Sequence, residues 1–325
     1  MRAPLFRRRR FLLAAAAGAT VMPLLPSCDQ PRPLVTSLHS WVGYETLVLA
    51  REFGWLPAWA QLRQVENAGE TLALLKSGAV DAGCLTLDEV LRARAAGVPL
   101  TVVLVFDVSA GADMVLARPG IESLADLAGK RLGLEEGAVG ALVLAKLLEV
   151  AGLPPSALTL VDLPPDRQVA AWQAGQVDAV VTFEPTATLL RRQGARLLFD
   201  SRQMPDTIFD VLAVRRERAS DRAAMRALVG GHFRALDHIR ASREDAVHRI
   251  ATHQGVAPEE VRQQLGGIAL PSLAANRGYL VPEGSHLLAA AAMLSTLMTG
   301  QGLLPREDAL DGLVSAIGLP SEEAR

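Results

Sequence analysis

The chain has little cysteine, few aromatic residues and no strong excess of either charge. Its 325 residues include two cysteines, four tryptophans, two tyrosines and eight phenylalanines. So few cysteines exclude a disulfide-dense scaffold. A composition that is 50% hydrophobic and 21% charged also excludes a disordered or collagen-like chain. The length is sufficient for two ordinary domains with separate cores.

Acidic residues outnumber basic residues after the first 27 positions. Five of the 33 Lys and Arg residues lie in residues 1–27, which contain no acid, so residues 28–325 carry 28 basic and 35 acidic side chains. Phosphate contacts need a concentrated basic surface, so we expect no nucleic-acid partner. No later stretch reaches about 18 uninterrupted apolar residues, and we expect no membrane span there.

Residues 1–27 have the pattern of an export signal. The cationic segment Arg7–Arg10 precedes an apolar run over residues 11–25, and the polar Ser27-Cys28-Asp29-Gln30 follows. Within this segment Arg8-Arg9-Arg10-Phe11-Leu12 resembles the twin-arginine pattern, although general secretion stays an alternative. We therefore expect residues 1–27 to lie outside the folded domains.

Leu25-Pro26-Ser27-Cys28 resembles a bacterial lipobox, whose cysteine becomes the lipidated first residue of the mature protein. The resemblance implies a lipid anchor at Cys28 and a place in the periplasm or on the outer face of the cytoplasmic membrane. A cleaved signal with an incidental cysteine is the alternative. Lipidation would leave Cys84 without a disulfide partner, and its apolar surroundings predict a buried, inert thiol.

Short apolar runs alternate with helical periodicity between residues 34 and 182. Strands are expected at 34–38, 80–85, 100–106, 131–134, 158–163 and 177–182, and helices at 44–53, 71–76, 87–96, 123–130, 139–151 and 169–174. This alternation predicts an α/β fold with mainly parallel sheets. The similar segments 76–82 and 173–179 indicate two similar lobes.

Beyond residue 215 the pattern predicts helices only. They are expected at 221–241, 243–254, 258–265, 285–299 and 306–317. Pro258-Glu259-Glu260 and Pro305-Arg306-Glu307-Asp308 are helix-start signals, with acids placed favourably for the helix dipole. We expect this helical tail to pack back on the first lobe.

Six segments, in order, resemble ABC-transporter substrate-binding proteins of the nitrate, sulfonate, taurine and thiamine-precursor group. The first is Trp41-Val42-Gly43-Tyr44-Glu45 running into a helix that ends at Gly54, an aromatic-x-Gly-Tyr loop that is this group's hallmark. The others are 78–83, 107–113, 121–137, 177–185 and 199–201. The resemblance extends from about residue 34 to residue 318.

This resemblance implies a two-lobed clamshell of the periplasmic-binding-protein type, with each lobe a mainly parallel sheet flanked by helices. Lobe 1 would comprise 34–110 plus 206–325 and lobe 2 would comprise 111–205, with crossings near 112–117 and 208–214. A small-molecule ligand would lie between the lobes, at the carboxyl ends of strands, and hinge motion would close them around it. A permease and an ATPase are the implied partners of a monomer that needs no cofactor or metal.

The expected ligand contacts begin in lobe 1. Trp41 and Tyr44 are placed to stack on a flat ligand or cap a cation, or else they pack under their loop. Thr86 offers either a hydroxyl to the ligand or an N-cap to the next helix. Asp107 and Ser109 end a strand, and we expect a ligand role for them in preference to a hinge role.

The remaining candidates lie on turns after later strands. Glu136, Gly137 and Ala138 occupy a strand-to-helix turn whose free amides suit an anion, although neighbouring carboxylates would repel one. Glu184 and Asp210 are ligand contacts or, alternatively, an interlobe salt bridge or cap. Asp113 is expected to be structural, paired with Arg118 or Lys130.

These loops contain acids and no Lys or Arg, so the favoured ligand is neutral or cationic, such as a nitrogen heterocycle, amidine or amine. A nitrate, sulfonate or taurine-type oxyanion is the alternative, especially if Arg277 reaches the cleft. The same fold resembles that of pyrimidine-synthesis and menaquinone-pathway enzymes, so an enzyme or a ligand sensor also stays open. Only His39 is well placed for catalysis, and we expect it to serve the core or its loop instead. We expect no catalytic residue.

Overall fold

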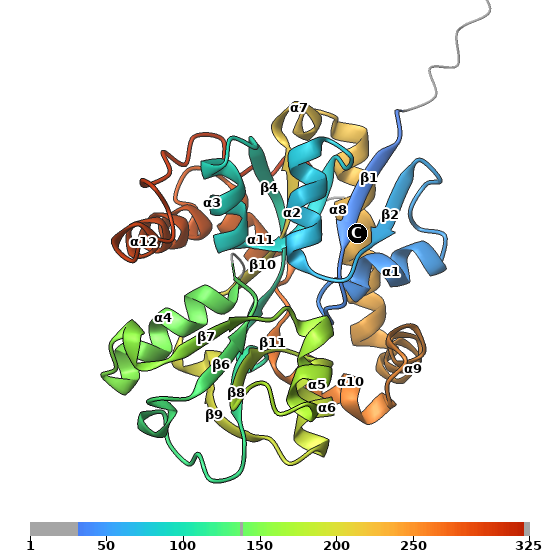
Figure 1. Ribbon diagram of the computed structural model, residues 1–325. Coiled ribbons are helices and arrows are strands. Elements are labelled where there is room, and N and C mark those ends of the chain that lie inside the picture. The colour runs from blue at the N-terminus through green and yellow to red at the C-terminus, as the bar shows by residue number, and fades with distance from the viewer. Residues whose placement is uncertain (1–31, 137–138, 322–325) are drawn as a thin grey trace, which may run out of the picture. The chain divides into compact units, whose positions relative to one another are not determined.

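The computed structural model describes residues 32–136 and 139–321, which form two β-sheets flanked by helices (Figure 1). The first sheet has the order β11-β4-β10-β3-β1-β2 and the second β7-β6-β8-β5-β9. In these orders the first-sheet strands are Ile268–Ala269, Leu100–Ser109, Phe209–Arg215, Ala82–Thr86, Leu34–Leu38 and Ala60–Gln64. The second-sheet strands are Thr159–Asp162, Arg131–Leu134, Ala179–Thr182, Met114–Ala117 and Arg196–Asp200. The predicted two-lobed α/β architecture is confirmed. Cys28, Gly137 and Ala138 lie outside the described residues.

Each sheet is mixed in direction, although we expected mainly parallel sheets. β1 pairs in parallel with β2 and β3, whereas β10 is antiparallel to both β3 and β4. In the second sheet β6 is parallel to β7 and β8, and β5 is antiparallel to β8 and β9. β5 and β10 are the strands that arrive from the other sheet. They enter where the parallel strands end, so they must run in the opposite direction.

The helices of the second half pack on the first lobe, as predicted. α8 (Arg222–Ala241) packs against α1 (Glu45–Glu52) and α9 (Arg243–Gln254), α11 (Leu273–Leu280) contacts β4, and α12 (His286–Gly300) contacts α3 (Leu87–Ala95). The remaining helices of this lobe are α2 (Ala68–Ser77), α7 (Arg216–Ala219) and α10 (Pro258–Gly266). The second lobe has α4 (Val139–Ala151), α5 (Pro165–Gln173) and α6 (Thr186–Arg192).

The helix expected at 71–76 is longer than predicted, because α2 extends over Ala68–Ser77. α2 begins at Asn67, whose side chain accepts the Glu70 N–H at 3.0 Å, and ends at Gly78 with φ of 75°. Cys84 is buried and free, and burial raises the pKa of its thiol well above the usual value. The predicted burial of this thiol is therefore confirmed.

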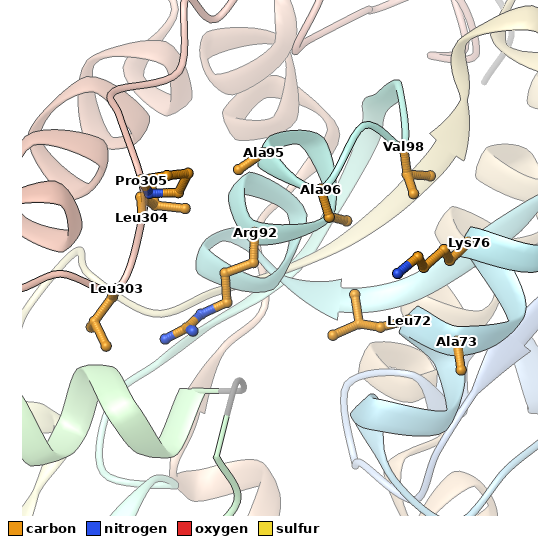
Figure 2. Close-up of a pocket in the computed structure, with 11 residues that line it drawn as sticks. Leu72, Ala73, Lys76, Arg92, Ala95, Ala96, Val98, Leu303, Leu304 and Pro305 are labelled. Carbon is orange, nitrogen blue, oxygen red and sulfur yellow. The ribbon is translucent and has the colours of Figure 1, made fainter.

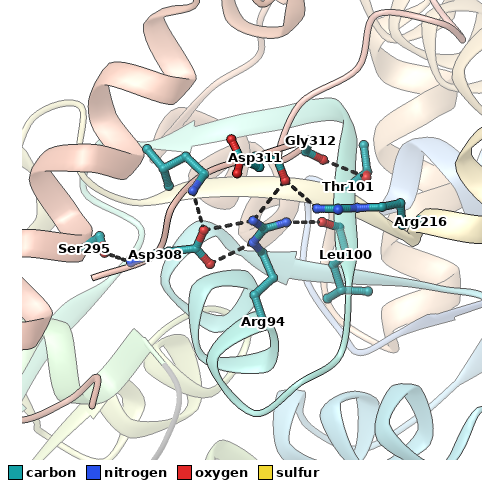
Figure 3. A network of polar contacts seen from close by, with 9 residues as sticks. Arg94, Leu100, Thr101, Arg216, Ser295, Asp308, Asp311 and Gly312 are labelled. Carbon is teal, nitrogen blue, oxygen red and sulfur yellow. Dashed lines mark hydrogen bonds and ion pairs between the residues drawn. The ribbon is translucent and has the colours of Figure 1, made fainter. Parts of the chain in front are cut away.

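The helix expected at 306–317 is wrong, because tertiary contacts hold this segment in an irregular conformation (Figure 3). The Arg94 guanidinium binds both carboxylate oxygens of Asp308 at 2.8 Å and also the Leu100 carbonyl at 2.8 Å. Leu310 and Gly312 have φ of 61° and 63°, values incompatible with a helix. Further along, Val314 bridges to Val102 of β4. These contacts outweigh the helical propensity.

Several elements were not predicted, and two of them carry little apolar signal. β2 is a mostly exposed edge strand of sequence AQLRQ, and β9 begins with exposed residues. The other elements not predicted are β5, β10, β11, α6, α7 and α11. The helix expected at 123–130 is only a 3-10 turn at Ala125–Leu127. Among residues 32–136 and 139–321 no helix is long and apolar enough to cross a membrane.

Candidate ligand-binding site

A cavity of about 20 Å³ lies between the lobes and is lined from both. The first lobe contributes from the loops and helix starts after its strands, and the second lobe contributes from the crossover and from turns after β6 and β8. The lining residues are His39, Trp41, Ala68, Thr86, Glu89, Asp113, Glu135, Val139, Phe183 and Asp210. The cavity has room for about one water-sized group.

The Trp41–Tyr44 loop is held against two buried aspartates. Trp41 Nε1 donates to Asp107 Oδ2 at 3.0 Å, and Tyr44 OH donates to Asp210 Oδ1 at 2.5 Å. A Cβ added at Gly43 would lie 1.7 Å from Asp107 Oδ2, so only glycine allows the loop this close to β4. The aromatic-x-Gly-Tyr pattern is therefore a packing requirement around these carboxylates.

Asp107 and Asp210 are directly opposite each other on the antiparallel strands β4 and β10. Burial raises the pKa of Asp107 to about 8, and nearby Asp113 reinforces this shift. Burial, followed by the charge of Asp107, raises the pKa of Asp210 well above its usual value. Burial raises the pKa of Asp113 to about 6. At neutral pH Asp113 is thus mostly ionised, whereas Asp107 is mostly protonated.

The start of α3 adds further acceptors beside the cavity. Glu89 Oε2 accepts the Thr86 backbone N–H at 2.9 Å, so Thr86 occupies the N-cap position while its hydroxyl has no hydrogen-bond partner in the described chain. Asp88 is buried beside it, with Arg92 Nε 3.9 Å away. Burial and the charge of Asp88 raise the pKa of Glu89 well above its usual value.

Contacts across the cavity join the two lobes. Phe183, which follows β8, meets Trp41 edge to face at 5.5 Å between ring centroids and lies 6.0 Å from the His39 ring. Glu135 Oε1 accepts the Gly69 N–H at 3.0 Å. Since burial lowers the pKa of His39 to about 4, its imidazole is neutral and adds no positive charge to the cavity.

The structure brings only some of the predicted contacts to the cavity. Trp41, Thr86 and Asp210 line it, whereas Tyr44 and Asp107 lie behind the lining residues.

Three other predicted contacts lie away from the cavity. Ser109 Oγ forms a hydrogen bond with Ser201 Oγ at 2.7 Å in the connection between the lobes. Glu184 Oε2 accepts the Thr188 N–H at 2.9 Å and so acts as a cap of α6. Glu136 is exposed, and its N–H donates to Asp162 Oδ1 at 3.1 Å.

Sequence reasoning assigned no ligand role to His39, Glu89, Asp113, Glu135 or Phe183, all of which line the cavity. All of them except Asp113 follow the end of a strand by one to three residues, which was the available signal, but the sequence does not show which side chain turns inward.

The expected pairing of Asp113 with Arg118 or Lys130 is wrong, because Asp113 lines the cavity. Arg118 donates to the Val177 carbonyl at 2.9 Å and packs over Trp172. Arg277 does not line the cavity, and it donates to the Pro320 carbonyl.

A larger groove of about 490 Å³ crosses α3 (Figure 2). It is bordered by α2 on one side and by residues 303–305 on the other, and its lining is mostly apolar. None of the predicted ligand residues that the structure describes lines it. Within the described ranges 32–136 and 139–321, no group of three or more His, Cys, Asp or Glu side chains is arranged to hold a metal ion.

Relatives by sequence are bacterial binding proteins. The taurine-binding periplasmic protein of Escherichia coli is 27% identical over 173 residues, which cover 52% of this chain and 53% of that protein. The match thus spans about half of each chain. A putative aliphatic sulfonates-binding protein of E. coli is 28% identical over 191 residues, covering 58% of this chain and 60% of the relative.

Solved structures with a similar fold cover most of the chain. The periplasmic aliphatic sulphonate binding protein SsuA from E. coli has a TM-score of 0.70 at 22% identity and covers 87% of this chain and 97% of its own. The periplasmic nitrate-binding protein NrtA from Synechocystis PCC 6803 has a TM-score of 0.68 at 13% identity, and the match covers 88% of this chain and 86% of NrtA. These likenesses show the fold.

The family model described as "NMT1/THI5 like" matches residues 60–241, more than half of the chain. This range includes α2, α3, the crossovers and every cavity residue except His39 and Trp41. The chain therefore belongs to the NMT1/THI5-like family.

Proposed function

We propose that this chain is the extracytoplasmic solute-binding component of an ABC importer. It captures a small molecule between its two lobes and delivers it to a permease that works with an ATPase. The observation that carries the proposal is the acid-lined cavity to which loops of both lobes contribute. The names of the E. coli relatives, a taurine-binding and an aliphatic sulfonates-binding protein, support the same role.

The favoured ligand is a neutral or cationic nitrogen-containing compound. Glu89, Asp113, Glu135 and Asp210 line the cavity, and no Lys or Arg is among the lining residues that the structure describes. A buried anion beside carboxylates is repelled unless they are protonated, whereas a cation is attracted to them. An oxyanion is the second candidate, and the taurine and sulfonate names of the relatives favour it.

Capture requires the lobes to part and close, because a cavity of about 20 Å³ is too small for a whole ligand. The chain passes between the sheets at residues 110–113 and 201–208, where Ser109 and Ser201 are hydrogen-bonded. We place lobe 1 at 34–110 plus 206–325 and lobe 2 at 111–205. Ligand contacts with both lobes then supply the differential affinity that favours closure.

We further propose that the protein is exported and held at the outer face of the cytoplasmic membrane through a lipid on Cys28. It acts as a monomer, without a cofactor and without chemistry of its own. The buried Cys84 thiol, whose pKa burial raises, is unsuited to act as a nucleophile.

A thermal-shift screen of residues 29–325 tests the proposal. The panel contains sulfonates, nitrate, amines, amidines, pyrimidines and purines. A ligand at a hundred times its dissociation constant adds about 2.7 kcal/mol to the free energy of unfolding, which is readily detected. A stabilising amine or nitrogen heterocycle supports the favoured ligand class, and a stabilising oxyanion alone supports the second candidate. The absence of any stabilising compound contradicts solute capture.

A further inference from the structure

We propose that Thr86 and Asp113 form a subsite for the protonated primary amine of the ligand, so that the substrate class is a small ammonium compound. This inference rests on the proposed solute-binding function. It adds the ligand's defining chemical group and the two side chains that select it.

Two oxygen atoms of the cavity lining have no partner. Thr86 Oγ1 and Asp113 Oδ2 are buried and make no hydrogen bond within the described chain. Thr86 is 7% exposed and Asp113 is 4% exposed. An unsatisfied buried polar group costs about 1–3 kcal/mol, so a group that donates N–H to both oxygens removes a penalty that the empty site carries.

Three N–H donors around the cavity are engaged by carboxylates. Trp41 Nε1 donates to Asp107, the Thr86 N–H donates to Glu89, and the Gly69 N–H donates to Glu135. These three groups would otherwise be available to an anion. Beside the ring nitrogen His39 Nδ1, the unpartnered atoms of the described lining are the oxygens Thr86 Oγ1 and Asp113 Oδ2, and a ligand that binds both oxygens must supply the donors.

The charge of the cavity lining also favours a cationic group. The pKa of Asp113, at about 6, leaves this carboxylate mostly ionised at neutral pH, and the described residues that line the cavity include no Lys or Arg to neutralise it. Charge-assisted hydrogen bonds from an ammonium group to a carboxylate are about twice as strong as neutral ones. An ammonium group thus supplies both the positive charge and the N–H donors that the Asp113 carboxylate lacks.

The geometry limits the kind of cation. The two unpartnered oxygens need a cation that donates N–H, which –NH₃⁺ does and a trimethylammonium group does not. Asp113 is held in place where its own N–H donates to Ser109 Oγ at 3.3 Å, and Ser109 is bonded to Ser201. Such fixed acceptors favour one small donor group.

Taurine and ethanesulfonate provide the test, because they share a sulfonate and a two-carbon chain and differ in the amine. Isothermal titration of residues 29–325 at pH 7.5 should show taurine binding about tenfold or more tightly than ethanesulfonate. n-Butylamine and n-butanol form a second pair without a sulfonate, and the amine should again bind more tightly. Equal or weaker binding of the amine in whichever pair binds overturns the proposal, as does a failure of all four compounds.

Variants assign the preference to the two side chains. Asp113→Asn and Thr86→Val should each reduce the amine's advantage to threefold or less, by weakening binding of the amine and leaving the partner compound unchanged. Asp237→Asn removes the same charge from an exposed position on α8 and should keep the full preference. Circular dichroism and thermal unfolding verify that each variant folds. An unchanged amine preference in folded Asp113→Asn overturns the subsite.

The subsite and the solute-binding function fail in different ways. A chain that binds ethanesulfonate or another panel compound without preferring amines loses the ammonium subsite and keeps its role in solute capture. A chain that binds no panel compound loses both.

Discussion

Replacing Asp107 with asparagine should change how the stability of the unliganded protein depends on pH. Asp107 is fully buried on β4 and receives the Trp41 Nε1–H, and its pKa is raised to about 8. In the unfolded chain an aspartate has a pKa of about 3.9. Between these two values the folded protein holds a proton that the unfolded chain has released, so the stability contributed by this group falls as pH rises.

The expected size follows from proton linkage. One proton bound only in the folded state changes the free energy of unfolding by about 1.4 kcal/mol per pH unit. Between pH 5 and pH 7 the wild type should therefore lose up to about 2.7 kcal/mol that Asp107→Asn does not lose. The asparagine keeps an oxygen that accepts from Trp41, so the hydrogen bond is preserved while the titration is removed.

Urea denaturation of both proteins at pH 5, 6 and 7 measures this difference. His39 and His232, whose pKa values burial lowers to about 4 and about 3, change the absolute stability in the opposite direction below about pH 6.5. Their contribution is common to both proteins and cancels in the comparison. If the free energies of unfolding of wild type and variant change in parallel with pH, Asp107 is not protonated in the folded state and the prediction is wrong.

Three further perturbations have defined outcomes. Gly43→Ala should lower the free energy of unfolding by about 1–3 kcal/mol in urea denaturation, because its Cβ would lie 1.7 Å from the Asp107 carboxylate. Gly230→Ala, which places a Cβ in open space, should not lower the free energy of unfolding. Asp308→Ala should lower the free energy of unfolding by about 3 kcal/mol, because it leaves the guanidinium of Arg94, whose side chain is only 9% exposed, without its carboxylate. Glu122→Gln, which breaks the exposed Arg196–Glu122 pair, should lower it by less than about 1 kcal/mol. Equal losses in the two variants would contradict this prediction. Cys28→Ser should move the protein from the membrane fraction to the soluble periplasmic fraction on immunoblots, and unchanged membrane association would contradict lipid anchoring.

The order of strands and helices could be predicted from the sequence wherever an element carries its own signals. The strand at 34–38 and the helices at 139–151 and 243–254 agree with β1, α4 and α9 because apolar periodicity and end signals lie within each segment. The irregular segment around Asp308 could not be predicted in this way. Its conformation depends on Arg94, more than two hundred residues earlier in the chain.

The candidate site was predictable as a region and less so as a set of side chains. Strand ends indicated Trp41, Thr86 and Asp210, which do line the cavity. Local sequence does not reveal that Asp107 turns inward beneath Gly43, or that Phe183 reaches Trp41 from the other lobe. Both depend on how separate strands are paired and how the two lobes meet.

The most direct test of capture between the lobes uses the compound that stabilises the protein most strongly in the thermal-shift screen. Its affinity is measured for two variants, each with a substitution on a different side of the cavity. Isothermal titration should show that Trp41→Ala and Phe183→Ala each weaken binding by about tenfold or more, because each removes an aromatic wall of the same cavity. Leu189→Ala, at a position 39% exposed on α6, should leave the affinity unchanged. Wild-type affinity in either aromatic variant would show that the ligand binds elsewhere and would contradict the account.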